Sequence, residues 1–136
     1  MKTAIIAALF FVLYLVPFSS KATDKIQELN EKIKASSDTE ELEKWQLELA
    51  DYYLSENLSE EYLEFFRSNE AQIKISKNSL FKARLFRYAG TFYVGTNQLD
   101  SGWLWLNLAH KIGEDQQLLV ELAQCLTQKS VYYQLT

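Results

Sequence analysis

The sequence has little of the chemistry that most enzymes use: its 136 residues include one cysteine, one histidine and one proline. A lone Cys125 excludes a disulfide framework within the chain. His110 and Cys125 fall on different predicted helices, so they form no nucleophile–base pair. No glycine-rich phosphate-binding loop occurs either. We therefore expect a protein that is not an enzyme and that needs no cofactor.

The charge and the composition exclude further classes. Lysine and arginine number 14 against 18 acidic residues, a formal net charge of -4, so the basic surface typical of nucleic-acid binding is missing. With 48% hydrophobic and 14% aromatic residues the chain is too apolar to be disordered. Its length fits one domain and is too short for a TIM barrel.

The N-terminus has the pattern of an export signal. Lys2 precedes 13 apolar residues, 4–16, and Ser20-Lys21-Ala22 follows with small residues where signal peptidase needs them. We expect a signal peptide over 1–22, cleavage after Ala22, a mature domain of 23–136 and a periplasmic or secreted location. The alternative is that residues 1–22 are kept as a membrane anchor, in which case the membrane is a partner.

The rest of the chain predicts helices throughout, because it contains no proline and almost no alternation typical of strands. Polar residues stand where three of these helices would begin and could cap them. The candidates are Asp38 or Ser37 for the first, Ser59 for the second, and Asn78 or Ser79 for the third. Residues 67–78 fit either an extended third helix or a loop. The expected helices cover residues 23–35, a stretch from the first cap to about 54, 59–66, 80–94, 103–112 and 115–128.

The ends and faces of these helices can also be predicted. A turn over 97–102 and a stop at Gly113 bound the helix that starts at Trp103. The 80–94 helix is apolar over most of its circumference, so it belongs in the middle of the domain. In the last helix the residues expected to face inward are Leu118, Leu119, Leu122, Ala123 and Leu126. Short links make neighbouring helices antiparallel, and the fold class is all-α.

A repeated pattern runs through residues 42–128. It joins a large residue, a Leu or Ala, a small residue and a Tyr or Leu, as in Gln46-x2-Leu49-Ala50-x2-Tyr53, Phe86-x2-Ala89-Gly90-x2-Tyr93 and Leu119-x2-Leu122-Ala123-x2-Leu126. The first two copies continue with Tyr62-x3-Phe66 and Gly102-x3-Leu106. This pattern resembles the tetratricopeptide repeat, in which helical hairpins stack into an array. An unrelated small helical bundle is the alternative.

The resemblance implies a scaffold that binds another protein. In that family the first helix of each repeat lines a concave groove, and here Arg84, Arg87 and Thr91 share one face of such a helix. Arginine suits the carboxylates of a partner protein. The alternative is that both arginines pair with acids of the same chain, such as Glu48 or Asp51.

A second candidate contact surface is Trp103, Asn107 and His110, which follow one another at spacings of four and three on the next helix. An exposed tryptophan often anchors an interface, although the preceding helix or the C-terminal tail could cover Trp103 instead. His110 and Glu114 alone supply too few ligands for a structural zinc site, so we expect no metal.

These observations favour an exported adaptor, assembly or regulatory protein that works by binding another protein. Two alternatives stay open. One is an immunity or inhibitor protein that blocks an exported toxin or enzyme, and the other is a membrane-anchored accessory subunit that retains residues 1–22.

Overall fold

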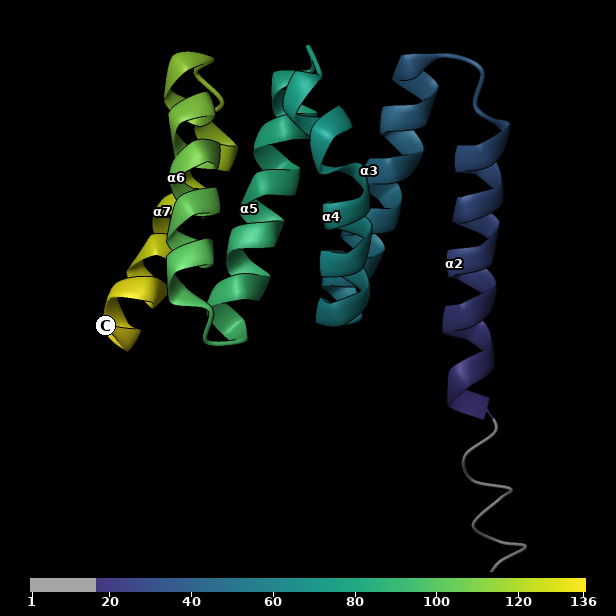
Figure 1. Cartoon of the computed structure of the whole chain (residues 1–136), viewed down its shortest axis with the longest axis horizontal. Helices are drawn as coiled ribbons and strands as arrows, with labels where there is room; N and C mark the ends of the chain where they lie inside the picture. The colour runs from purple at the N-terminus through teal and green to yellow at the C-terminus, as the bar shows by residue number, and fades with distance from the viewer. Residues whose placement is uncertain (1–16) are drawn as a thin grey trace, which may run out of the picture. The chain divides into compact units, whose positions relative to one another are not determined.

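A computed structural model describes residues 17–136, which form six α-helices and no strand (Figure 1). The predicted all-α class is confirmed for these residues. The helices are α2 (Pro17–Ala35), α3 (Thr39–Ser55), α4 (Ser59–Ile75), α5 (Ser79–Gly95), α6 (Leu99–Asp115) and α7 (Leu119–Leu135).

The predicted signal peptide lies largely outside the described residues, because its apolar run 4–16 is not among them. Helix α2 begins at Pro17, six residues before the helix expected from residue 23. Proline is well tolerated in the first turn of a helix, where its missing N–H has no partner to lose. The predicted cleavage site after Ala22 therefore falls inside α2. Among the described helices, none has the length and apolar character needed to cross a membrane.

Helices α3 to α7 are regular in length and spacing. Each has 17 residues, and each is joined to the next by three residues, so α3, α5 and α7 begin 40 residues apart. This spacing is a helical repeat in the structure itself. It moves the third copy of the sequence pattern: the residues of α7 equivalent to Gly90 and Tyr93 are Ser130 and Tyr133, and the predicted alignment on Ala123 and Leu126 is wrong by seven residues.

Three of the connections are built in the same way. Asn57, Asn97 and Gln117 have positive φ angles of 55°, 61° and 55°. The next residue then donates its N–H to a carbonyl five residues back, as in Leu58 to Tyr53 at 2.8 Å. This is a Schellman-type helix end, in which asparagine or, once, glutamine replaces the more usual glycine.

Of the two alternatives for residues 67–78, the extended third helix is confirmed, since α4 continues to Ile75. Two predicted helix limits are wrong: α6 begins at Leu99 within the predicted turn, and α7 covers 119–135 in place of 115–128. Ser59 is the first residue of α4 and forms no cap, whereas Asp38 and Asn78 do cap helices, by accepting from the N–H groups of Glu41 and Phe81. Gly113 does not stop α6, because the helix continues to Asp115.

The described residues divide into two compact units, one that ends at residue 49 and one that begins at residue 50, so the boundary lies within α3. In the first unit, Lys25 of α2 donates to Glu48 of α3 at 3.3 Å. Lys32 lies 4.4 Å from the centre of the Trp45 ring. Trp45 itself is only half-buried.

In the second unit α5 is central, as predicted: it packs against α4, α6 and α7, and 11 of its 17 residues are buried. The core between α4, α5 and α6 is aromatic. The rings of Phe66 and Trp105 are 4.8 Å apart, and those of Tyr62 and Phe92 are 5.1 Å apart. Tyr62 is fully buried and donates its hydroxyl to the carbonyl of Leu85 at 2.6 Å.

Two glycines let α5 and α6 approach closely. A methyl group on Gly90 would lie 2.7 Å from Leu106, and one on Gly102 would lie 2.5 Å from Val94. Both distances are shorter than carbon atoms can approach, so an added methyl group would force its neighbours to move. The small residues of the sequence pattern thus mark a real helix crossing, and Ala50 is fully buried as well.

Candidate protein-binding site

The two arginines of the predicted α5 face meet on one carboxylate of α7. The Nε of Arg84 donates to Glu121 Oε1 at 2.9 Å, and the Nε of Arg87 donates to Oε2 of the same residue at 3.0 Å. The side chains of Glu121 and Arg87 are 2% and 9% exposed, while that of Arg84 is 27% exposed. Arg87 is thus a buried connector between two helices, and Arg84 is the member that still reaches the surface.

The acids expected to pair with these arginines have other partners. Glu48 binds Lys25, and Asp51 accepts a 2.5 Å hydrogen bond from the hydroxyl of Tyr88. Burial and the Asp51 carboxylate together raise the pKa of Tyr88 well above its ordinary value. The geometry therefore agrees with the alternative in which both arginines pair with an acid of the same chain, and that acid is Glu121.

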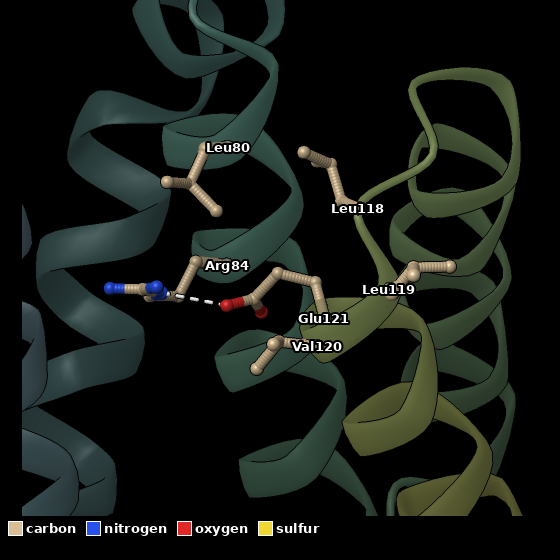
Figure 2. Close-up of a pocket in the computed structure, with 6 residues that line it drawn as sticks. All are labelled: Leu80, Arg84, Leu118, Leu119, Val120 and Glu121. Carbon is tan, nitrogen blue, oxygen red and sulfur yellow. Dashed lines mark hydrogen bonds and ion pairs between the residues drawn. The ribbon is translucent and has the colours of Figure 1, made fainter.

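A hollow of about 290 Å³ lies beside the exposed arginine. We call it the Arg84 pocket; it is lined by Leu80, Arg84, Leu118, Leu119, Val120 and Glu121. Figure 2 shows Leu80 and Leu118 over the Arg84–Glu121 contact, with the start of α7 as the other wall. Leu80, Leu119 and Val120 are 40%, 74% and 68% exposed, so the apolar wall is open to solvent.

The electrostatics of the pocket favour an anion. Glu121 is one carboxylate shared between two guanidinium groups, which leaves the three side chains with one positive charge in excess. Burial alone would lower the pKa of Arg84, but the hydrogen bond and the charge of Glu121 outweigh burial and raise it. Arg84 is therefore cationic at any physiological pH. In Figure 2 one nitrogen of its guanidinium is directed away from the Glu121 carboxylate.

The third residue predicted on this face is turned toward its own helix. Thr91 donates its hydroxyl to the carbonyl of Arg87 at 2.9 Å and is half-buried. Such a bond to the preceding turn occupies the hydroxyl proton.

The second predicted surface, on α6, is partly covered. Trp103 stacks on Tyr132 with ring centres 4.8 Å apart and meets Tyr133 edge-on at 5.4 Å. Lys129 lies 5.1 Å from the centre of the Trp103 ring. The C-terminal part of α7 therefore shields this tryptophan, which agrees with the alternative of coverage by the C-terminal tail.

The other two residues of that surface are half-buried. Asn107 keeps part of its surface in solvent, and His110 Nε2 lies 3.3 Å from Glu114, one turn further along α6. His110 Nδ1 is buried without a hydrogen-bond partner in the described part of the chain. Within residues 17–136, the arginines of α5 contact Glu121, whereas Trp103 contacts Tyr132 and Tyr133 and His110 contacts Glu114, so the structure places the six predicted residues in two separate regions.

Sequence reasoning missed the residue that organises the pocket. Glu121 stands in the first turn of a helix, where an acid is ordinarily a solvated charge. One feature of the sequence does indicate its role: Glu121 lies three residues after Leu118, in an apolar stretch. An isolated acid in such a stretch needs a cationic partner if it is buried. Leu119 was expected to face inward; it is exposed because Glu121, Leu122 and Cys125 make up the inner face of α7 instead.

No known protein family, curated protein or solved structure matches this chain.

Proposed function

We propose that the chain is an exported helical-repeat protein, similar to a short tetratricopeptide array, that binds a segment of another protein at the Arg84 pocket. The observation that supports this most is an open apolar hollow beside a partly exposed arginine whose carboxylate partner is shared with a second arginine. An apolar cavity with one well-placed charged group is the usual form of a recognition site.

The pocket suits a peptide segment with an aliphatic side chain next to a carboxylate. The aliphatic group would replace water against Leu80, Leu119 and Val120. The carboxylate, from an Asp, a Glu or a chain end, would bind the free edge of Arg84, since a guanidinium can bind two carboxylates along different edges.

The repeat geometry supports the same region. The charged residues of this region come from the three helices that begin 40 residues apart. Asp51 lies on α3, Arg84 and Arg87 lie on α5, and Glu121 lies on α7. In the tetratricopeptide family the equivalent first helices form the ligand-binding surface. The 40-residue spacing is six residues longer than that family's repeat, so the likeness concerns the arrangement of helices more than the repeat length.

The test begins with cross-linking in the native host, from which the attached protein is identified and purified. Its affinity is then measured for the unchanged protein, for Leu80→Asp and for Ala71→Glu, an exposed α4 position that serves as the matched control. We expect Leu80→Asp to weaken binding at least about tenfold, or about 1.4 kcal/mol, and Ala71→Glu to change it little. Equal affinity for all three proteins would refute the pocket as the binding site.

Export is tested separately, by mass spectrometry of the N-terminus of the protein recovered from the host. A chain that begins at Thr23 supports secretion, whereas one that retains Lys2 supports the anchored alternative.

A further inference from the structure

The beginning and the end of α7 are buried to very different extents. Near its beginning, Glu121 and Cys125 are 2% and 0% exposed. The structure describes every one of residues 126–135, and none of them is buried. Tertiary packing is what stabilises most helices in proteins, so a helical segment with no buried residue opens more readily than the rest of the fold. We call residues 126–135 the strap.

An aromatic cluster docks the strap on α6. The Trp103 ring stacks on Tyr132, with ring centres 4.8 Å apart, and meets Tyr133 edge-on at 5.4 Å. The Lys129 ammonium lies 5.1 Å from the centre of the same Trp103 ring. Tyr133 is 62% exposed, so the cluster lies at the surface of the protein. Aromatic pairs and exposed cation–π contacts each stabilise only modestly, so little free energy opposes separation of the strap from α6.

A histidine lies on the same face of α6. Two contacts fix how the helices face each other: Trp103 stacks on Tyr132, and a methyl group on Gly113 would lie 3.5 Å from Leu122. His110 lies between Trp103 and Gly113 along α6, and its spacing of seven from Trp103 gives both side chains the same direction. Because α7 runs antiparallel to α6 here, His110 lies opposite the beginning of the strap.

One ring nitrogen of this histidine carries an energetic cost in the docked state. Nδ1 of His110 is buried and has no hydrogen-bond partner in the described part of the chain. The other ring nitrogen, Nε2, lies 3.3 Å from Glu114. A buried nitrogen without a partner is destabilising, because it has lost the hydrogen bond that water would give it. When the strap separates from α6, water reaches Nδ1 and this cost is removed.

From this arrangement we infer that the strap opens as a unit while residues 119–125 stay docked, and that His110 favours the open state. Opening uncovers Trp103 and so completes the second surface expected from the sequence, which Trp103 forms with Asn107 and His110. The strap is thus a cover over that surface. The inference does not depend on the proposed function, because the Arg84 pocket lies at the other end of α7.

Hydrogen–deuterium exchange of the protein as purified from its host, resolved by residue with NMR, measures opening of the strap separately from unfolding. We expect the strap to exchange faster than residues 119–125, with one common protection factor for its buried-side and exposed amides. Fraying from the helix end would instead give protection that falls steadily toward residue 135. Tyr132→Ala removes the stacking on Trp103, and we expect it to speed exchange in the strap at least about tenfold.

His110→Leu tests the role of the histidine, because leucine keeps a similar size and has no nitrogen to leave unpartnered. We expect exchange in the strap to slow about tenfold. Lys111→Leu adds a leucine at the neighbouring exposed position and serves as the matched control, with no change expected. Unchanged or faster exchange in His110→Leu would overturn the role of His110. Graded protection along the strap, or one protection factor shared by the strap and residues 119–125, would overturn its opening as a unit.

Discussion

The crossing of α5 and α6 predicts a sharp difference among the four glycines. A methyl group at Gly102 would lie 2.5 Å from Val94 Cγ2, 3.0 Å from the Val94 main-chain nitrogen and 3.2 Å from the Gly90 carbonyl oxygen. Two of these atoms belong to the backbone, so the helices themselves have to separate. At Gly113 the nearest atoms are 3.5 Å away, an ordinary contact distance, and at Gly95 nothing lies within 4 Å.

The magnitude follows from two opposing effects. Glycine-to-alanine replacement within a helix stabilises by about 1 kcal/mol through helix propensity, and inserting a methyl group into a packed contact costs about 1–3 kcal/mol. Because Gly102 and Gly113 both lie inside α6, the propensity effect is common to them. We therefore expect the free energy of unfolding to be about 1–3 kcal/mol lower for Gly102→Ala than for Gly113→Ala.

Urea unfolding followed by circular dichroism measures this difference. Gly90→Ala should fall between the two, because the atoms nearest to it belong mainly to the flexible side chain of Leu106. Equal stability of Gly102→Ala and Gly113→Ala would refute the close crossing, and with it the packing of the central hairpin.

Three further predictions concern charge and burial. Glu121→Ala leaves the buried Arg87 without its carboxylate, and we expect thermal or urea unfolding to show a loss of about 3–5 kcal/mol; a loss below 1 kcal/mol would contradict the buried contact. Trp45→Ala should cost about 1–2 kcal/mol, less than a core tryptophan, because the ring is half-buried beneath Lys32. Burial raises the pKa of Cys125 to about 11, above the value of about 8.5 in an unfolded chain. The unfolded state therefore loses this proton first, and stability should fall as the pH rises from about 9 to 11. Cys125→Ala, measured by urea unfolding over the same pH range, should reduce that fall, and an unchanged fall would exclude the thiol as its source.

Much of the fold follows from local features of the sequence. The absence of proline after residue 17 and the apolar periodicity predict helices, and the caps Asp38 and Asn78 mark two helix starts correctly. The glycines mislead, because three of them lie inside helices at packed positions while Asn57, Asn97 and Gln117 form the turns. From the sequence alone, a glycine that ends a helix cannot be told from a glycine that packs against a neighbouring helix. Only the position of that neighbouring helix distinguishes the two roles.

The candidate site was less predictable, because the residues that form it are far apart in the sequence. The shared face of Arg84 and Arg87 follows from their spacing, but Glu121 lies 37 and 34 residues away from them. Local periodicity says nothing about such a pair. In α7 both faces contain apolar residues, so the sequence pattern also fitted an inner face with Leu119 and Leu126, although both are exposed.

Hydrogen–deuterium exchange, with and without the partner identified by cross-linking, tests the central claim most directly. The account predicts that binding slows exchange in residues 79–87 and 118–125, which contain both walls of the Arg84 pocket. Protection confined to other segments, with these two unchanged, would contradict it.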